Sequence, residues 1–292
     1  MRHPCRGRVT VAVALALALS SLALAGCDAA PPDDGRLPVV VGFYPLQFVA
    51  ERVGADRVAV TDLAQPGAEP HDLELSPRQV ASIADARLVV TVHGFQPALD
   101  EAAEQAGAPV LDVAGLVPLL AADPHVWLDP TRLATIGDGL ARRLTELDPA
   151  GADDYARHAT ALRGELEALD AEFTAGLAQC QRHEIVVSHA AFGYLTQRYG
   201  LRQIPITGLS PETEPTPAHL ASAAQEARRV GATTIFFETL VSPAVAEAVA
   251  REIGATTAVL DPVEGLQPGG TGDYLSVMRD NLTTLRAALG CA

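Results

Sequence analysis

The sequence contains no lysine, so arginine supplies all of its fixed positive charge, and we interpret this as coding bias. Basic residues are also few: 21 stand against 36 aspartates and glutamates, which gives a formal net charge of −15 at pH 7. A surface this acidic disfavours nucleic acid and anionic lipid as partners and mildly favours cations in its vicinity. The charge balance by itself indicates no specific site.

Cysteine is rare as well, with four residues in a chain of 292. Cys180 and Cys291, the two outside the N-terminal segment, stand in no metal-ligand spacing. In an oxidising compartment two such cysteines often pair. A bridge between them would close a loop of about 110 residues and stabilise the fold by ~4–5 kcal/mol at most in the chain-entropy model. The sequence leaves open whether their Cα atoms come within bonding range.

The N-terminal segment has the features of an export signal. Arg2, Arg6 and Arg8 form a positive start, and Val9–Gly26 contains no charged residue. The segment ends in small residues directly before Cys27, which is the pattern of a bacterial lipoprotein cleavage site. A transmembrane helix is the alternative, because the uncharged stretch is near the lower limit for spanning. Its Ala- and Ser-rich composition and its end at the cleavage pattern favour the signal peptide.

We therefore predict a signal peptide over residues 1–26, cleavage before Cys27 and lipidation of the Cys27 thiol. An acidic, Pro-rich stretch follows, so residues 27–37 are expected to be the acylated cysteine and a flexible spacer. The mature protein would be extracytoplasmic and anchored to the cell membrane as a lipoprotein, through its lipid alone.

The rest of the chain alternates between short, β-branched apolar runs and amphipathic segments. Such alternation predicts an α/β protein with parallel sheets flanked by helices. The predicted strands are Leu37–Gly42, Val58–Leu63, Leu88–Val92, Val110–Val113, Glu184–Ser188, Ile204–Ile206, Thr233–Phe237 and Thr257–Leu260. The predicted helices are Leu46–Val53, Arg78–Ala86 with Ser76-Pro77 at its start, Pro97–Ala106, Pro130–Leu147, Phe192–Tyr199, Pro217–Val230, Pro243–Ile253 and Asp273–Leu289.

One longer helix separates two series of these units. It is predicted from Pro149 to about Gln179, with Leu162, Leu166 and Phe173 on one apolar stripe. We therefore expect two lobes, an N-terminal one over residues 38–148 and a C-terminal one over 181–292, joined by a rigid linking helix over 149–180. No sequence repeat relates the two lobes.

Three histidines stand in short, well-formed contexts: Pro70-His71-Asp72, Asp123–Trp127 around His125, and Val187–Ala190 around His189. Asp261-Pro262 adds a carboxylate. Three imidazoles and one carboxylate make a complete shell for zinc. The long gaps between them exclude a local zinc finger. Because ligands bind beyond the carboxyl ends of parallel strands, we expect a metal site in the cleft between the lobes.

Four stretches carry a resemblance to a known family. They are Pro66–Pro77 (PGAEPHDLELSP), Asp123–Pro130 (DPHVWLDP), Ser188–Leu195 (SHAAFGYL) and Leu260–Pro262 (LDP), and the second is the most specific. They resemble the four metal-ligand motifs of the substrate-binding proteins of zinc and manganese ABC importers, the ZnuA/TroA-like group. The resemblance covers essentially the whole mature chain, including the single long connecting helix.

Position by position, the resemblance implies metal ligation by His71, His125, His189 and Asp261. Members that favour manganese typically have a carboxylate where this chain has His189, and a nitrogen-rich shell favours Zn²⁺ over Mn²⁺. The implied function is capture of Zn²⁺ for delivery to an ABC importer. Its permease and ATPase are the expected partners, together with a candidate metallochaperone. We expect a monomer without catalytic activity and without nucleic acid.

Other functions remain open at this point. One is the manganese-binding component of an importer. Another is a zinc-dependent hydrolase, which needs an open coordination position; Asp261 as fourth ligand and the absence of an HExxH pattern argue against it. A third is an adhesin or metal-sensing surface lipoprotein that binds metal only structurally.

Two further residues have open roles. Glu238, at a strand end, could accept a hydrogen bond from a ligand imidazole or face solvent. His93, also after a strand, could be a transient ligand or a surface residue.

Overall fold

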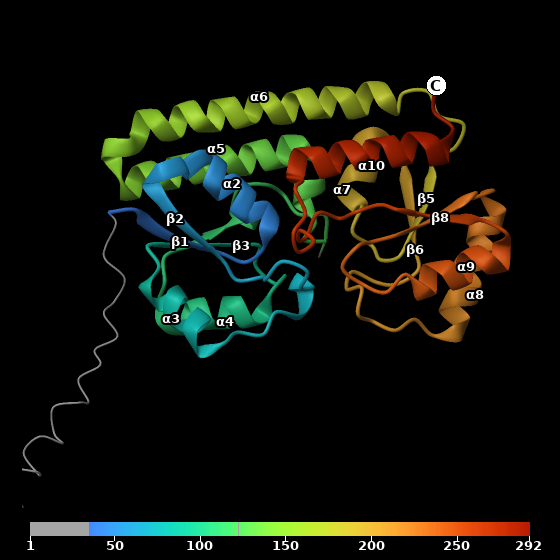
Figure 1. The fold of residues 1–292 in the computed structure, drawn as a ribbon, viewed down its shortest axis with the longest axis horizontal. Helices are drawn as coiled ribbons and strands as arrows, with labels where there is room; N and C mark the ends of the chain where they lie inside the picture. Colours follow the sequence, from blue (N-terminus) through green and yellow to red (C-terminus); the bar gives the residue numbers. More distant parts are fainter. Residues whose placement is uncertain (1–34, 122) are drawn as a thin grey trace, which may run out of the picture. The chain divides into compact units, whose positions relative to one another are not determined.

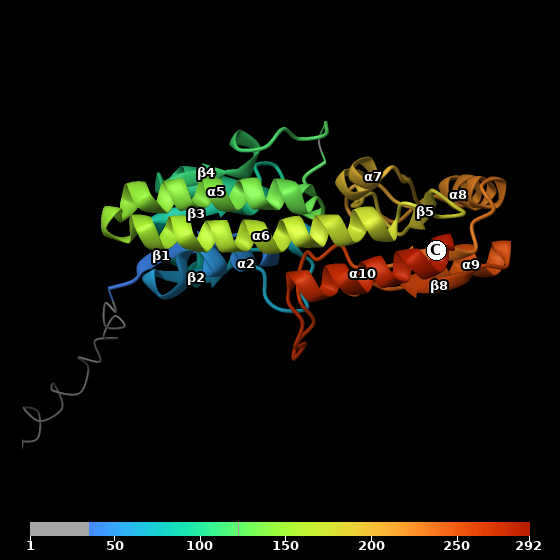
Figure 2. The same cartoon turned by 90° about the horizontal axis from the view of Figure 1, so that it is seen from above.

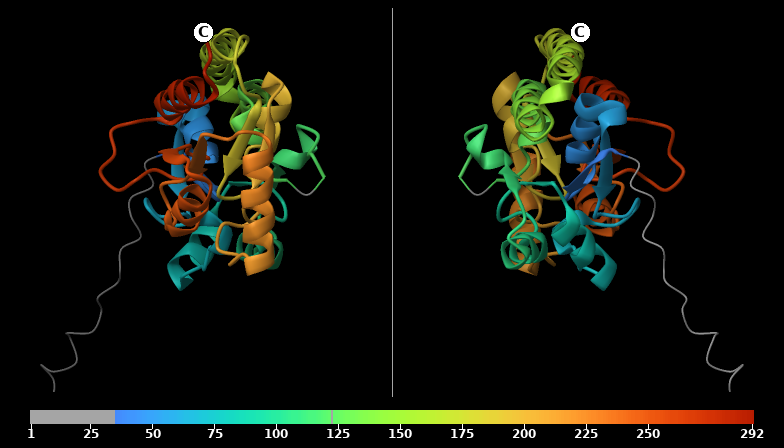
Figure 3. Two further views of the ribbon diagram at one scale, coloured as in Figure 1. Left: turned by 90° about the vertical axis from the view of Figure 1, so that its right-hand side faces the viewer. Right: turned by 90° about the vertical axis from the view of Figure 1, so that its left-hand side faces the viewer.

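Two four-stranded parallel sheets, each with helices on both faces, make up the described part of the chain (Figures 1 and 3). This computed structural model describes residues 35–121 and 123–292, and Arg36–Ala292 forms one compact unit. The predicted signal peptide, Cys27 and most of the predicted spacer lie outside the described residues. None of the helices in the described part is long and apolar enough to cross a membrane.

The two sheets have the same topology. Their strand orders are β2-β1-β3-β4 and β6-β5-β7-β8, and every neighbouring pair is parallel. The two lobes are therefore a structural duplication that the sequence does not reveal. The strands are β1 (Leu37–Val41), β2 (Val58–Asp62), β3 (Leu88–Thr91), β4 (Val110–Asp112), β5 (Glu184–Val187), β6 (Arg202–Pro205), β7 (Thr234–Phe237) and β8 (Thr256–Val259).

Local capping signals set the helix ends. The predicted start at Ser76-Pro77 is a capping box, in which the Ser76 hydroxyl accepts from the Gln79 N–H and the Gln79 side chain accepts from the Ser76 N–H. The helices are α2 (Tyr44–Gly54), α3 (Pro77–Asp85), α4 (Pro97–Ala106), α5 (Pro130–Leu147), α6 (Ala152–Gly176), α7 (Gly193–Tyr199), α8 (Pro217–Arg229), α9 (Ala244–Ile253) and α10 (Tyr274–Leu289).

The side-chain alternation of the strands divides the core into layers. Val40 and Val89 pack with residues of α3 and α4 in one cluster, whereas the neighbouring Val39 and Val90 belong to a larger cluster with α2, α5 and α6. Val186 packs in the same way with α8 and α9 in the second lobe. The larger cluster continues through both lobes, from α2 and α5 to α7 and α10, so the lobes share one core.

Helix α6 runs along both lobes, beside α5 and then beside α10 (Figure 2). Its 25 residues would span about 37 Å. Ion pairs join it to both lobes. In its middle, Arg163 and Glu165 pair with Asp138 and Arg52 of the first lobe. Nearer its C-terminal end, Asp170 and Glu172 pair with Arg198 and Arg279 of the second lobe. The helix is shorter than predicted, because Pro149–Gly151 forms a separate 3-10 turn and the helix ends at Gly176.

A disulfide joins Cys180, which follows α6, to Cys291, which follows α10. The two cysteines are 111 residues apart in the sequence. Backbone N–H groups of Gln181 and Arg182 also donate to the Leu289 carbonyl. The C-terminal helix is therefore tied to the start of the second lobe both covalently and by hydrogen bonds.

Removing this bridge should destabilise the protein. We expect the double variant Cys180→Ser/Cys291→Ser to lose about 2–4 kcal/mol of unfolding free energy, because its unfolded chain is no longer constrained. Urea denaturation of the exported protein measures this. A reducing agent should lower the midpoint of the wild type and leave that of the variant unchanged; equal midpoints for the oxidised wild type and the variant would contradict the prediction.

Candidate metal centre

Four side chains from loops of both lobes converge on one point. His71 lies in the 3-10 turn Pro70–Asp72 after β2, and His125 precedes the 3-10 turn Val126–Leu128. His189 lies two residues after the end of β5, and Glu264 lies in the loop after β8. Each offers one ligand atom, and these atoms all lie within 4.8 Å of one another. His125, His189 and Glu264 are completely buried. The predicted histidines are thus brought together between the lobes.

The carboxylate of Glu264 lies at the centre of this group. Its Oε1 is 3.5 Å from Nε2 of His71, 3.0 Å from Nε2 of His125 and 3.4 Å from Nε2 of His189. All three Nε2 atoms and both Glu264 oxygens are buried, and among the described residues they face only one another. Buried polar atoms are normally paired, and three imidazole lone pairs and a carboxylate that face one another need protons or a cation between them, so the group is suited to bind a cation.

Outer carboxylates orient two of the imidazoles. Nδ1 of His125 lies 2.6 Å from Oδ1 of Asp123, and Nδ1 of His189 lies 2.8 Å from Oε1 of Glu238. A proton on each Nδ1 donates to these oxygens, which leaves the Nε2 lone pairs directed at the centre. The arrangement fits a divalent metal bound by three neutral imidazoles and one carboxylate, the donor set of zinc. Glu238 therefore takes the orienting role and does not face solvent.

Without a cation, these groups share protons. Burial opposes a charge on Glu264, but hydrogen bonds with the three histidines outweigh it and hold the pKa of its carboxyl well below its usual value. Burial likewise lowers the pKa of His189, but bonds to Glu238 and Glu264 raise it to about 10. Bonds to Asp123 and Glu264 raise the pKa of His125 against the same effect of burial. A bound metal would replace these protons.

The fourth predicted ligand, Asp261, is not among the four converging residues. Its Oδ1 accepts from the Val263 N–H at 2.7 Å and its Oδ2 from the Thr239 hydroxyl at 2.7 Å, so both oxygens are already used. Asn281 holds its backbone on both sides, accepting from the N–H at 2.8 Å and donating to the carbonyl at 2.6 Å. Asp261 shapes the turn, and the carboxylate that faces the histidines is that of Glu264, three residues later.

The turn between these acids is strained. Val263 is buried and has φ +58°, a conformation that β-branched residues rarely adopt. Its N–H is held by Asp261, and the preceding Pro262 carbonyl accepts from Nε1 of Trp127 at 2.7 Å. The Trp127 carbonyl in turn accepts from the Tyr274 hydroxyl at 2.5 Å. These bonds from both lobes keep the turn in the conformation that directs Glu264 to the histidines.

His93, the second residue with an open role, lies outside the centre. The His93 side chain is 74% exposed and lies 3.3 Å from Asp100, which is a surface arrangement. Two carboxylates of this group were not predicted from the sequence, Asp123 and Glu264. The available signal was their position, two residues before His125 for the first and three residues after Asp261 for the second.

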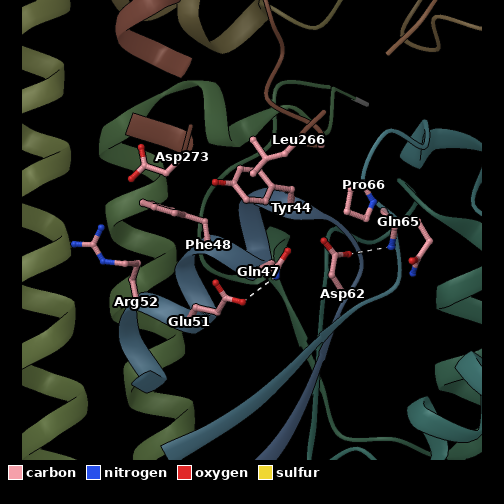
Figure 4. Close-up of a pocket in the computed structure, with 12 residues that line it drawn as sticks. Tyr44, Gln47, Phe48, Glu51, Arg52, Asp62, Gln65, Pro66, Leu266 and Asp273 are labelled. Atoms are coloured by element: carbon pink, nitrogen blue, oxygen red, sulfur yellow. Dashed lines mark hydrogen bonds between the residues drawn. The ribbon is translucent and has the colours of Figure 1, made fainter. Parts of the chain in front are cut away.

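A separate pocket of about 620 Å³ lies between α2, the loop after β2 and the segment that follows Glu264 (Figure 4). Gly265 and Leu266 line it, and so does Asp62, whose pKa burial raises to about 7. None of the four converging residues lines this pocket. It is therefore distinct from the metal centre.

Comparison with known proteins agrees with this geometry. The family model described as zinc-uptake complex component A, periplasmic, matches residues 39–288. The chain belongs to this family. Two relatives of the zinc-uptake family are the zinc-binding lipoprotein AdcA of Streptococcus pneumoniae, 32% identical, and the high-affinity zinc uptake system protein ZnuA of Bacillus subtilis, 31% identical. The matches cover 91% and 87% of this chain, and 58% and 88% of those proteins.

Solved structures of the family share the fold. The Zn(II)-bound ZnuA-like domain of S. pneumoniae AdcA is similar, with a TM-score of 0.75 at 33% identity over 87% of this chain and 99% of that domain. The laminin-binding protein Lmb of Streptococcus agalactiae, described as a bifunctional protein with adhesin and metal transporting activity, has a TM-score of 0.80 at 33% identity, covering 87% and 99%. The two-lobed α/β fold is thus that of the family.

The role of Asp261 in the turn can be tested without metal. Asp261→Ala removes the acceptor of the Val263 N–H and of the Thr239 hydroxyl, so we expect a loss of about 1–3 kcal/mol in unfolding free energy. Asp261→Asn keeps an oxygen for Val263 and should lose less. Urea denaturation of the metal-free variants compares them. An alanine variant as stable as the wild type would refute the role of Asp261 in holding the turn.

Proposed function

We propose that this protein is an extracytoplasmic solute-binding protein that captures Zn²⁺ and delivers it to the permease of an ABC importer. The observation that carries the proposal is the group of four buried donors, His71, His125, His189 and Glu264, whose ligand atoms converge without other partners. Membership of the zinc-uptake family and the similarity to a Zn(II)-bound domain support it.

The donor set favours zinc over manganese. Three imidazole nitrogens and one carboxylate suit a borderline-soft ion in tetrahedral geometry, whereas Mn²⁺ prefers oxygen donors. Four protein ligands also complete the shell. A hydrolase needs a position open to water, so the arrangement supports transport of the ion rather than its use in catalysis.

The cellular setting follows from the N-terminal sequence. We propose cleavage of residues 1–26, lipidation of Cys27 and a spacer over 27–37 that anchors the protein to the cell membrane. The N-terminal lobe (38–148), the linking helix (149–180) and the C-terminal lobe (181–292) then act as one monomeric receptor. Its partners would be the importer permease and ATPase, with a metallochaperone as a further donor of zinc.

A pair of isosteric variants tests which carboxylate binds zinc. Glu264→Gln should weaken Zn²⁺ binding by more than about 100-fold, because even residues that only orient metal ligands contribute 10–100-fold. Asp261→Asn should stay within about tenfold of the wild type, because it keeps the acceptor for Val263. Chelator-competition titration of metal-free protein gives both affinities. The reverse order would assign the ligand to Asp261.

The pH dependence should extend above the ordinary histidine range. Zinc binds imidazoles only after they lose the proton on Nε2, and in the metal-free protein the pKa of His189 is raised to about 10 and that of His125 is also raised. The apparent affinity for Zn²⁺ should therefore rise steadily from pH 7 to pH 9, with release of protons on binding. Competition titrations and calorimetry in two buffers measure this; an affinity independent of pH in this range would contradict it.

A further inference from the structure

A second group of ligand atoms adjoins the four donors. It consists of Glu69 in the loop after β2, Glu238 after β7 and Glu264, and one oxygen of each lies within 4.8 Å of the others. The three carboxylates come from three segments and both lobes. The ion pairs found for Glu238 and Glu264 among the described residues are with histidines only.

Each outer glutamate uses one oxygen and leaves the other without a partner. Oε1 of Glu69 accepts from the His71 N–H at 3.0 Å, and its Oε2 is buried without a hydrogen bond. Oε1 of Glu238 accepts from the Ser188 hydroxyl at 2.7 Å and from Nδ1 of His189, and its Oε2 is also buried and unpaired. Glu238 is only 2% exposed, so solvent does not compensate for the missing bond.

The surroundings provide an approach for a cation. Glu238 and Ser188 line a hollow of about 200 Å³ on the second lobe. Two exposed acids, Glu212 and Glu214, line the same hollow. Glu69 is only half-buried, whereas His125 and His189 lie completely inside. Glu238, which lines the hollow, and the half-buried Glu69 can therefore be reached from the surface before His125 and His189.

We propose that Glu69, Glu238 and Glu264 form an outer cation position that receives Zn²⁺ before the histidines do. Glu264 belongs to both positions. An ion can therefore exchange the oxygens of Glu69 and Glu238 for three imidazole nitrogens while it remains bound to Glu264. Carboxylate oxygens hold zinc less specifically than imidazoles, so the ion moves on to the inner position. The inference rests on the proposed capture of zinc.

The rates of zinc binding test this outer position. Glu69→Gln replaces the unpaired Oε2, which the cation would bind, with an amide nitrogen that cannot bind it, and keeps Oε1 as the acceptor for the His71 N–H. A residue that binds Zn²⁺ only during its passage to the histidines changes the rates of entry and of release alike. We therefore expect both the association and the dissociation rate constants to fall by about tenfold, with their ratio nearly constant. Stopped-flow fluorescence of Trp127, whose ring centre is 5.2 Å from that of His125, follows Zn²⁺ at fixed ionic strength.

The matched control is Glu74→Gln, the same change on an exposed acid of the same loop. It should leave both rates within twofold of the wild type, since long-range attraction is screened. Equal slowing in the control, unchanged rates in Glu69→Gln, or faster dissociation in Glu69→Gln would each overturn the outer position. If the wild type itself fails to bind Zn²⁺ tightly, the capture function fails instead, so the two failures are distinguishable.

A measurement on the wild type needs no variant. Ca²⁺ prefers oxygen ligands and competes poorly for imidazole, so it should occupy the outer position alone. Millimolar Ca²⁺ should then slow the association of Zn²⁺ relative to NaCl of the same ionic strength. Equal rates in the two salts would contradict the proposal.

Discussion

The structure depends on one unfavourable arrangement: a carboxylate, Glu264, that is completely buried and faces three imidazole nitrogens without a stable partner. Burying an unpaired charge is costly, and a protein tolerates it only where something else compensates. In the metal-free protein, shared protons compensate in part. A divalent cation compensates fully, because it satisfies the carboxylate and all three lone pairs at once. The groups whose mutual burial is unfavourable without a cation are thus the ones that provide the affinity for it.

Such a centre must be held in place by the fold, since each of its residues alone would move toward water. The two lobes repeat one sheet topology and present their loops to each other. Helix α6 is ion-paired to both lobes, and one hydrophobic core continues through them. Trp127 of the first lobe holds the Pro262 carbonyl of the second. The contacts that join the lobes are therefore also those that position the ligands.

Much of the fold could be predicted from local signals. α4 and α5 have the predicted bounds, because a proline at the first helical position begins each of them. The histidines could be found because each stands in a distinctive context at a strand end. The carboxylate that faces them could not, since Asp261 and Glu264 follow the same strand. The engagement of the Asp261 carboxylate is visible only in its hydrogen bonds, in which its oxygens accept from the Thr239 hydroxyl and the Val263 N–H. The pairing of Cys180 with Cys291 likewise required tertiary geometry.

A crystal structure of the zinc-loaded protein, starting at Asp28 and recorded at the zinc absorption edge, tests the central claim most directly. The account predicts one zinc ion within about 2.0–2.2 Å of Nε2 of His71, His125 and His189 and of an oxygen of Glu264. Asp261 should keep its bonds to Thr239 and Val263. A zinc ion bound by Asp261, or one bound away from the three histidines, would contradict the account.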